Sequence, residues 1–362
     1  MINFRNFAHL ASDEKMDAVI CHGPRDYRVE KVPIPKAQKN EVIMRIVACG
    51  ICTSDCKCYQ GAKYFWDDSG GKPMIPTPII PGHEFFGYAE ELGEGADNHF
   101  GVKRGDRIIA ENILPCRECK FCKSGRYGMC EVHDIYGFQL DGAFAKYMRV
   151  PERSNIYKIP ESLSIEDCSI IEPLAGAIHA VNRADIQLDD VVVIAGAGPL
   201  GLLMCQVARL KTPKKLIVID LMDEKLNLAK RYGADLTINP KRENARKVVK
   251  DITEGYGSDV YIEVTGATEG GLEMIRRLGR FVEFSIFGHD ITCDWSMIGD
   301  RKELDIRGSH AGPYCYPVAI DLLERRLVTS QGIVTHTFAL TDWDKAIEVA
   351  CSLDSIKVIL KP

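Results

Sequence analysis

The feature that most restricts the fold of this chain is an apolar run that leads directly into a glycine motif. Residues 191–195 are all apolar, and the sequence Gly-Ala-Gly-Pro-Leu-Gly follows at 196–201. A short apolar run bounded by glycine is typical of a buried strand, and Pro199 suits the first turn of a helix. The first glycine permits a tight turn, the second lets a ligand approach the backbone, and the third lets the helix pack closely on the strand. The pattern predicts one strand, turn and helix of a parallel sheet.

The sequence after this motif continues to alternate between strand and helix patterns. Further apolar strands are predicted at 215–219, 260–264 and 280–284. Between the first two of them, Asp223 is suited to cap a helix that stops at Gly233. Strands that alternate with helices in this way predict a doubly wound, parallel α/β sheet.

An acidic residue stands at the end of the second strand. The strand at 215–219 ends in Asp220, about twenty residues beyond the glycine motif. A carboxylate there accepts hydrogen bonds from ribose hydroxyls and repels a ribose phosphate, and no arginine follows it. The sequence therefore favours NAD over NADP as the cofactor. The alternative is that the motif is an ordinary strand, turn and helix that binds no nucleotide and carries an exposed aspartate. The predicted cofactor-binding residues are Gly196, Gly198, Pro199, Leu200, Gly201 and Asp220.

The first half of the chain is predicted to be mainly β, because short alternating strands are separated by glycine and proline clusters. Four closely spaced cysteines lie in this half. Their spacing is C-x2-C-x2-C-x7-C, and they are Cys116, Cys119, Cys122 and Cys130. Four thiolates close a tetrahedral zinc site with no open position, which is typical of a structural zinc. The alternatives are unrelated thiols, a redox or iron-sulfur site, and a nucleic-acid-binding zinc ribbon, although ribbons usually have a longer spacer.

A second group of metal-ligating residue types lies in the same half. Cys52, Ser54 and Asp55 form one short motif, and His83 and Glu84 form another. A thiolate, an imidazole and a carboxylate can hold zinc and still leave a position for substrate or water. A buried cysteine more often packs than ligates, but both motifs together, beside a nucleotide fold and a closed thiolate site, favour an open metal site.

Composition excludes several classes of protein. The chain has 362 residues, 46% of them hydrophobic and 27% charged, which is typical of a globular chain of about two domains. A net charge of -5 provides no basic field for nucleic acid or an anionic membrane, so a small-molecule partner is expected. The N-terminal segment lacks the apolar core of a signal peptide, and no apolar run is long enough to span a membrane. The fourteen cysteines are therefore expected to be reduced in the cytoplasm.

The order of these motifs resembles the zinc-dependent medium-chain dehydrogenase/reductase family over essentially the whole chain. The resemblance implies an α/β plus β fold. A GroES-like catalytic domain is expected at 1–175, a doubly wound Rossmann domain that binds NAD at 176–310, and a return to the catalytic domain at 311–362. It also implies a homo-oligomer, with a tetramer favoured over a dimer.

The resemblance also implies roles for single residues. Cys52 and His83 are expected to ligate a catalytic zinc, Asp55 to orient the histidine, and Ser54 to relay a proton from the substrate. The segment 171–174 is similar to the polyol dehydrogenase branch, which makes its glutamate, Glu172, a further acidic ligand candidate alongside Glu84. The sequence leaves open which carboxylate completes the zinc shell. It also leaves open whether the outer proton path runs through water or Lys57.

The expected reaction is oxidation of a secondary hydroxyl of a short polyol to a ketose, with NAD as oxidant and two zinc ions per subunit, one catalytic and one structural. Within the polyol branch, several segments are similar to dehydrogenases of four-carbon polyols, namely 58–61, 63–66, 133–138, 259–263 and 312–317. A longer polyol such as sorbitol or xylitol, and L-threonine, are the alternative substrates. A zinc- and nucleotide-binding protein without turnover is the alternative from another class.

Overall fold

Two compact units make up the chain. The computed structural model describes residues 11–66, 74–287 and 290–362, so most of the N-terminal segment considered above lies outside the described residues. The first unit comprises Met1–Glu172 and Val334–Pro362, and the second comprises Pro173–Ile333. The predicted boundary at 175 lies near the first division, whereas the chain returns at Val334 and not at 311. The segment before Val334 stays with the second unit, where the Gln206 side chain donates to Thr329 O at 3.1 Å and accepts from its N–H at 2.9 Å.

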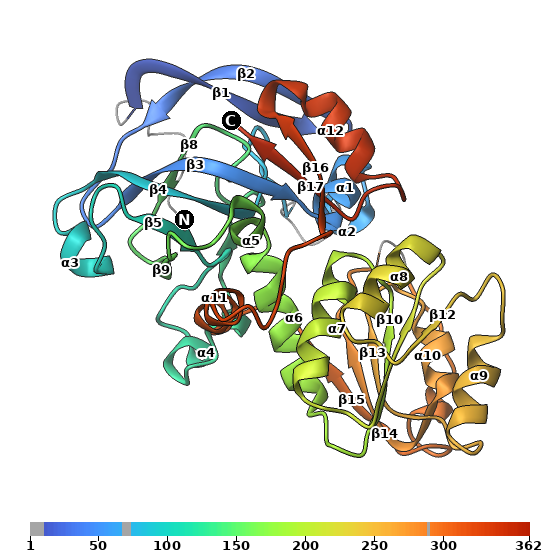
Figure 1. Cartoon of the computed structure of the whole chain (residues 1–362). Helices are drawn as coiled ribbons and strands as arrows, with labels where there is room; N and C mark the ends of the chain where they lie inside the picture. The colour runs from blue at the N-terminus through green and yellow to red at the C-terminus, as the bar shows by residue number, and fades with distance from the viewer. Residues whose placement is uncertain (1–10, 67–73, 288–289) are drawn as a thin grey trace. The chain divides into compact units, whose positions relative to one another are not determined.

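The first unit is built on a seven-stranded sheet with the order β16-β17-β3-β4-β5-β9, in which β8 also pairs with β3 (Figure 1). Two small two-stranded sheets, β1-β2 and β6-β7, accompany it. The strands are β1 (Ala11–Gly23), β2 (Asp26–Pro35), β3 (Val42–Ile51), β4 (Glu84–Leu92), β5 (Arg107–Ala110), β6 (Ile113–Leu114), β7 (Asp134–Ile135), β8 (Tyr147–Val150), β9 (Ile156–Lys158), β16 (Val334–Ala339) and β17 (Lys357–Lys361). The helices are α1 (Thr53–Tyr59), α2 (Lys63–Trp66), α3 (Ala96–Phe100), α4 (Lys120–Lys123), η3 (Tyr127–Met129), α5 (Ile165–Ser169), η5 (Leu340–Asp342) and α12 (Trp343–Ala350).

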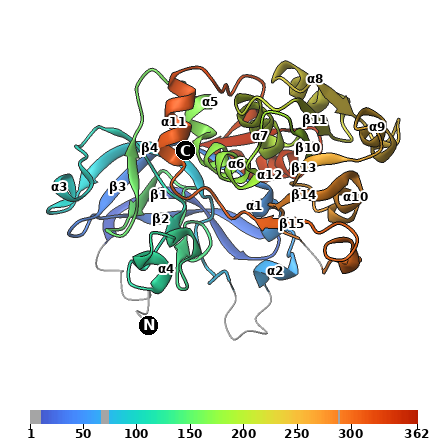
Figure 2. The ribbon, with the colours of Figure 1, turned by 90° about the horizontal axis from the view of Figure 1, so that it is seen from below.

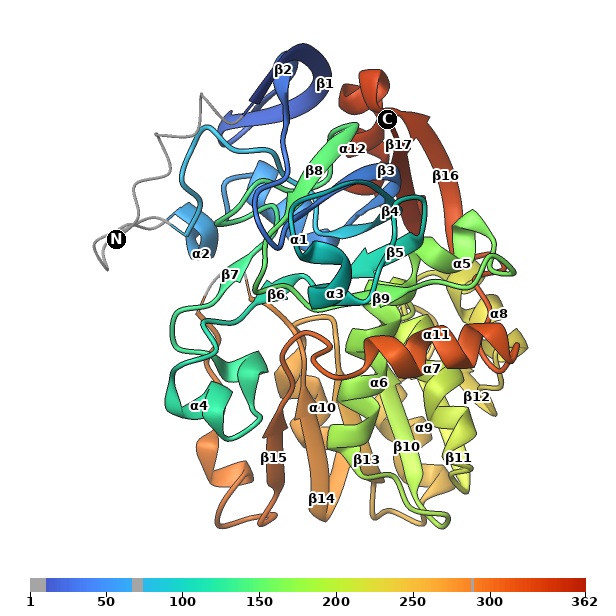
Figure 3. The same cartoon turned by 90° about the vertical axis from the view of Figure 1, so that its left-hand side faces the viewer.

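The C-terminal strands complete this sheet. β17 is parallel to β16 and antiparallel to β3, with Val358 opposite Ile51. The strand order β16, β17, β3, β4, β5 and β9 can be followed in Figure 3. The helix between the last two strands, α12, contacts α1 and lies beside it in Figures 1 and 2. Residues from both ends of the sequence therefore meet around the start of α1.

The second unit contains one six-stranded parallel sheet with the order β12-β11-β10-β13-β14-β15. The order reverses between β10 and β13, which is the topology of a doubly wound dinucleotide-binding sheet. Its strands are β10 (Val191–Ala195), β11 (Lys215–Ile219), β12 (Leu236–Ile238), β13 (Ser258–Glu263), β14 (Ile275–Glu283) and β15 (Asp305–Gly308). Its helices are α7 (Pro199–Leu210), α8 (Asp223–Arg231), α9 (Ala245–Ile252), α10 (Thr268–Met274), η4 (Trp295–Met297) and α11 (Tyr316–Glu324), and α6 (Ile171–Ala184) begins in the first unit. The prediction of a doubly wound parallel sheet is confirmed.

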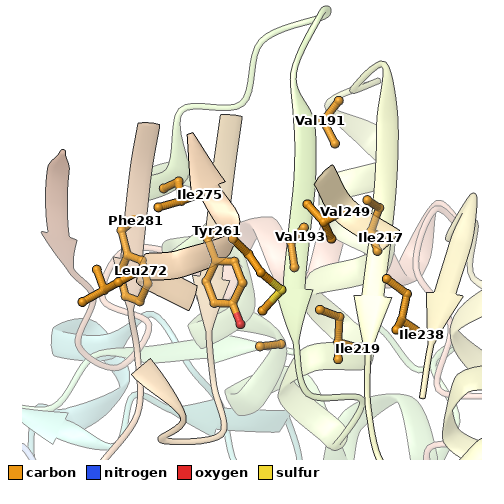
Figure 4. Close-up of a cluster of buried hydrophobic side chains, with 12 residues drawn as sticks. Val191, Val193, Ile217, Ile219, Ile238, Val249, Tyr261, Leu272, Ile275 and Phe281 are labelled. Carbon is orange, nitrogen blue, oxygen red and sulfur yellow. The ribbon is translucent and has the colours of Figure 1, made fainter. Parts of the chain in front are cut away.

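The burial of this sheet explains why the sequences of its central strands are continuous runs of apolar residues. All five residues of β10 are buried, since the strand has neighbours on both sides. Alternate residues of one face, among them Val193, Ile217 and Tyr261, pack into a single cluster with Val249 of α9 (Figure 4). A strand that is buried on both faces loses the polar alternation of a half-exposed strand.

One local prediction in this unit is confirmed and one is wrong. The helix α8 ends at Arg231, and Gly233 follows with a φ of 98°, the left-handed conformation expected for a helix stop. Asp223, however, is the first residue of α8 and not its cap, which is Met222. The Asp223 carboxylate instead accepts a 2.8 Å hydrogen bond from the Asn239 side chain and pairs with Arg242. Among the described residues, no helix is both long and apolar enough to cross a membrane.

Candidate metal centres and dinucleotide site

The first candidate metal ligand caps α1. Cys52 lies between β3 and α1 as the N-cap of the helix. Its backbone N–H donates to Asp55 Oδ2 at 2.8 Å, and the other oxygen of Asp55 lies 3.5 Å from His83 Nδ1. The Asp55 side chain is buried, so one fixed carboxylate spans both predicted ligands. This is the position that the predicted orienting role of Asp55 requires.

A tight glycine turn delivers the next two candidates. Gly82 has a φ of 95°, and a Cβ at this position would lie 2.5 Å from the Phe144 ring. His83 follows the turn, and Glu84 begins β4 opposite Gly50 of β3. A Cβ on Gly50 would lie 2.2 Å from Glu84 Oε2, so the missing side chain makes room for the carboxylate. Both glycines are therefore required for the placement of this pair.

These three side chains suit a zinc ion. The candidate ligand atoms of Cys52, His83 and Glu84 lie within 4.8 Å of one another. Burial opposes a charge on His83, but the Asp55 carboxylate and the Cys52 thiol raise its pKa well above the ordinary value. The cluster thus favours a positive charge at its centre. Because Nδ1 faces Asp55, Nε2 is the nitrogen left for a metal, and sulfur, nitrogen and oxygen donors together are typical of zinc.

Lys357 is a member of this site that the sequence interpretation missed. Its Nζ donates to both oxygens of Glu84, at 2.7 and 2.6 Å, and to Ile51 O at 3.3 Å. Burial opposes the charge on Lys357, but the Glu84 carboxylate raises its pKa above the ordinary value. The ion pair is almost completely buried, with 3% and 1% of the two side chains exposed. Nothing in the local sequence of β17 indicates this role.

Glu172 lies beside the cluster but outside the group of three. Its Oε1 accepts a 2.8 Å hydrogen bond from Asn112 Nδ2, a second contact that the sequence interpretation missed. Burial, reinforced by the Glu84 charge, raises the pKa of Glu172 to about 7. Glu84 is already neutralised by Lys357, whereas Glu172 is held by a neutral amide. Which of the two carboxylates ligates zinc stays a prediction.

The other predicted residues of this region also lie on α1. Ser54 is half-buried in the first turn of the helix, next to Asp55, and Lys57 lies one turn further on. An aromatic pair closes one side of the site, because the Phe138 ring lies 5.2 Å from His83 and stacks on Phe65 at 5.6 Å. Phe65 is therefore a packing residue of this wall.

The four closely spaced cysteines form a separate lobe around α4 and η3. Their sulfur atoms lie within 4.8 Å of one another. Cys116 and Cys122 are 3.9 Å apart, and Cys119 and Cys130 are 4.0 Å apart. Backbone N–H groups lower the pKa of Cys119 to about 6, which favours the thiolate that a metal needs. The geometry and the donor set suit the predicted closed zinc site.

The glycine motif shapes the second unit for a dinucleotide. Gly196 has a φ of 107°, and a Cβ on Gly201 would lie 1.9 Å from Gly196 O, so neither position accepts a side chain. Gly198 caps α7, and a Cβ there would meet nothing within 4 Å. The helix begins with Pro199 and has no acid in its first turn. Open space before a helix N-terminus without an acid suits a diphosphate.

Asp220 connects the second strand to this turn. Its Oδ2 accepts from Ala197 N at 2.7 Å and its Oδ1 from Met222 N at 2.8 Å. The carboxylate is half-buried and keeps further acceptor capacity for ribose hydroxyls. Its placement beside the glycine motif is the one that the predicted ribose contact requires.

A buried glutamate that the sequence interpretation missed supports the same turn. Glu263, at the end of β13, accepts hydrogen bonds from Thr265 N, Thr265 Oγ1 and Gly266 N at 2.5, 2.6 and 2.8 Å. A Cβ on Gly196 would lie 2.8 Å from the Thr265 methyl carbon. Glu263 therefore holds the segment against which the glycine motif packs.

Comparison with known proteins decides the family. Residues 38–161 match the model of the alcohol dehydrogenase GroES-like domain, and residues 199–325 match that of the zinc-binding dehydrogenases. The chain is 47% identical to an erythritol/L-threitol dehydrogenase of Mycolicibacterium smegmatis, over 96% of this chain and 98% of that protein. This chain belongs to the zinc-binding medium-chain alcohol dehydrogenase family.

A further relative and two solved structures agree with this assignment. A sorbitol dehydrogenase of Halalkalibacterium halodurans is 32% identical over 94% of this chain and 97% of that protein. A zinc-binding dehydrogenase of Sinorhizobium meliloti, solved with NADP, has a TM-score of 0.85 at 27% identity, covering 97% of this chain and 100% of that one. An Escherichia coli protein described as a short chain alcohol dehydrogenase, solved with NADH, has a TM-score of 0.84 at 27% identity, covering 96% of this chain and 99% of that one. The predicted family, GroES-like and Rossmann folds and polyol dehydrogenase class are confirmed.

Loss of one lobe cysteine should remove the structural metal from this medium-chain dehydrogenase. We expect Cys119→Ser to contain about one zinc ion fewer per chain and to melt at a lower temperature, because a closed thiolate site contributes directly to folding. Metal analysis and a thermal melt check both. Cys293→Ser, at a half-buried cysteine outside both clusters, is the matched control. An unchanged zinc content would contradict the assignment.

Proposed function

We propose that this polyol dehydrogenase uses NAD to oxidise a secondary hydroxyl of erythritol or L-threitol, with L-erythrulose as the product. The observation that carries the proposal is the 47% identity, over 96% of the chain, to a protein that acts on these polyols by its name. The sorbitol dehydrogenase relative reaches only 32%. The segments that resemble four-carbon polyol enzymes include 63–66 and 133–138, which contribute Phe65 and Phe138 to the aromatic wall beside His83.

Each candidate site residue of the first unit has a proposed task in this reaction. When bound, zinc would act as a Lewis acid that lowers the pKa of the substrate hydroxyl, and NAD would accept the hydride. Cys52, His83 and one of the two carboxylates, Glu84 or Glu172, would hold this zinc ion. A second zinc ion would bind in the cysteine lobe. Asp55 fixes Cys52 and His83 through the contacts described above. Ser54 takes the hydroxyl proton and passes it outward.

Removal of the Ser54 hydroxyl should slow the reaction without weakening cofactor binding. We expect Ser54→Ala to lower kcat by about 10²-fold or more, the usual contribution of a positioned proton-transfer group. Steady-state rates and a titration of NAD fluorescence quenching separate the two effects. Thr53→Ala, at the exposed neighbour on α1, is the matched control. A normal rate for Ser54→Ala would assign the relay to another group.

Asp220 should determine the choice between NAD and NADP. We expect Asp220→Ser to raise the apparent KM for NAD by about tenfold, because loss of a hydrogen bond from a charged acceptor costs about 1.5–3 kcal/mol. The same change removes the repulsion of a ribose phosphate, so activity with NADP should rise. Initial rates with both cofactors measure the preference. If the KM for NAD and the KM for NADP are both unchanged in Asp220→Ser, Asp220 has no role in cofactor choice.

A substrate panel tests the proposed function. The zinc-loaded protein is assayed for NAD reduction with erythritol, both threitols, xylitol, sorbitol, L-threonine and ethanol at matched concentrations. A clear preference for erythritol or L-threitol supports the proposal. Turnover confined to a longer polyol or to L-threonine would overturn the substrate and leave the class of enzyme intact.

Two further properties belong to the same proposal. We propose that the protein acts in the cytoplasm, which is supported by its fourteen cysteines, all free. We also propose a homotetramer, on the resemblance to polyol dehydrogenases, and light scattering of the purified enzyme measures it. A monomer would overturn this part alone.

A further inference from the structure

Two carboxylates end neighbouring strands of the parallel sheet. Glu263 is the last residue of β13 and Glu283 is the last residue of β14, and the two lie opposite each other in the register of these strands. Glu263 is 0% exposed, and Glu283 is half-buried. Both belong to the second unit, the one that carries the glycine motif.

Only neutral groups hold these two carboxylates. Glu263 Oε1 accepts the three hydrogen bonds from the turn after β13, whereas its Oε2 is buried without a hydrogen-bond partner among the described residues. Glu283 accepts from Ser285 N and from Thr268 Oγ1, both at 2.9 Å. In the part of the chain that the structure describes, neither carboxylate forms an ion pair with a lysine, arginine or histidine. Burial raises the pKa of Glu283, and the Glu263 carboxylate raises it further.

The topology relates this pair to one half of the dinucleotide. The strand order reverses between β10 and β13, and a dinucleotide binds across such a reversal with one mononucleotide on each side. Asp220, the proposed ribose ligand of the adenosine half, follows β11 on one side. The nicotinamide half then belongs to the other side, at the carboxyl ends of β13 and β14. Glu263 and Glu283 lie at those ends.

We propose that the Glu263 carboxylate, with Glu283 beside it, raises the affinity of this dehydrogenase for NAD relative to NADH. The inference rests on the proposed use of NAD. The oxidised nicotinamide ring carries a positive charge, which hydride transfer removes. A carboxylate that no cation neutralises attracts the charged ring, and burial leaves this attraction weakly screened by water and salt. The charge acts over a distance, so Glu263 needs no contact with the cofactor.

This preference has a consequence for the direction of the reaction. Reduction of the ring removes its charge and with it the attraction. NADH should therefore dissociate sooner after polyol oxidation, because differences in affinity between related complexes arise mainly from dissociation rates. The same charge disfavours ketose reduction, in which NADH is the substrate that must be bound.

Separate titrations with NAD and with NADH test the proposal through the quenching of protein fluorescence. We expect Glu263→Gln to lower the ratio of the Kd for NADH to the Kd for NAD by about tenfold, the size of effect that a unit charge exerts in a medium of low effective dielectric constant. The glutamine Oε1 can keep the hydrogen bonds to the turn, and the amide nitrogen replaces the oxygen that has no partner. If Glu263→Gln weakens the binding of both forms equally, the residue only supports the turn and the proposal is overturned.

Further variants separate charge from packing. Glu263→Asp keeps the charge on a shorter side chain, so it should preserve the ratio of the two constants. Glu283→Gln should lower the ratio in the same direction as Glu263→Gln, and it serves if the latter fails to fold. Asp220→Ser, on the adenosine half, should weaken the binding of both forms equally. Glu269→Gln, at an exposed acid in the first turn of α10, should leave both constants unchanged.

Two other results distinguish this inference from the proposed function. An unchanged ratio in a Glu263→Gln enzyme that still oxidises polyols would overturn the role of Glu263 alone. An unmodified chain that binds neither NAD nor NADH would overturn the proposed cofactor together with this inference.

Discussion

Replacement of His83 by alanine is expected to abolish polyol oxidation and to remove the catalytic zinc alone. The ring is buried, its candidate ligand atom lies within 4.8 Å of those of Cys52 and Glu84, and its Nδ1 lies 3.5 Å from Asp55 Oδ1. Lewis-acid catalysis by a metal contributes several kcal/mol, and each 1.36 kcal/mol is a factor of ten in rate. We therefore expect kcat/KM to fall by about 10³-fold or more. Metal analysis should find the zinc of the cysteine lobe retained.

The control for this variant is a histidine of the same unit that lies outside the site. His99 is exposed on α3, and its side chain hydrogen-bonds to Glu152 O, far from the candidate zinc ligands in sequence. His99→Ala should keep full activity and the full zinc content. NAD binding should survive in both variants, because the glycine motif belongs to the other unit. A His83→Ala enzyme that retains substantial activity would refute the catalytic metal site.

Removal of the Lys357 charge should destabilise the first unit. Lys357→Met leaves the Glu84 carboxylate buried without its partner, and a broken buried ion pair typically costs about 3–5 kcal/mol. Zinc should reduce this cost, because a bound cation beside Glu84 compensates part of the same charge. We therefore expect the free energy of unfolding to fall more in the zinc-free protein than in the zinc-loaded protein. Urea unfolding with and without zinc measures both values.

Two further variants isolate the ion pair. Lys361→Met changes a half-buried lysine of the same strand and should be close to neutral. Lys357→Met combined with Glu84→Gln removes both charges and should recover part of the lost stability, which gives the coupling energy of the pair. If Lys357→Met is as stable as the unmodified protein in both metal states, the pair contributes nothing to folding.

The sequence allowed prediction of those parts of the protein that local spacing defines. The glycine motif and the lobe cysteines each lie within a short stretch, and the backbone of that stretch alone brings their atoms together. The parallel sheet followed from apolar runs such as 191–195, because strands buried on both faces carry no polar alternation. Cys52 and His83 depended on the family resemblance, because β3 and β4 must pair before the two residues meet.

The parts that could not be predicted are contacts between distant segments. Lys357 and Glu84 are 273 residues apart, and Asn112 and Glu172 are 60 apart, so no spacing rule joins either pair. Asp223 failed as a cap for a related reason, because Asn239 and Arg242 of a later segment engage its carboxylate. In each case the side chain is bound by a residue that is distant in sequence, so its neighbours in the sequence do not reveal its role.

The pairing of β17 with β3 has a consequence for the order in which the molecule is assembled. Lys357 reaches Ile51 O across 306 positions of sequence, whereas the second unit is one continuous segment of 161 residues, Pro173–Ile333. During synthesis, every strand of the second unit leaves the ribosome before β17 exists. The nucleotide-binding half can therefore fold while the other half still lacks a strand and the lysine that neutralises Glu84. The candidate zinc site therefore acquires its lysine only after β17 has been translated and has paired with β3.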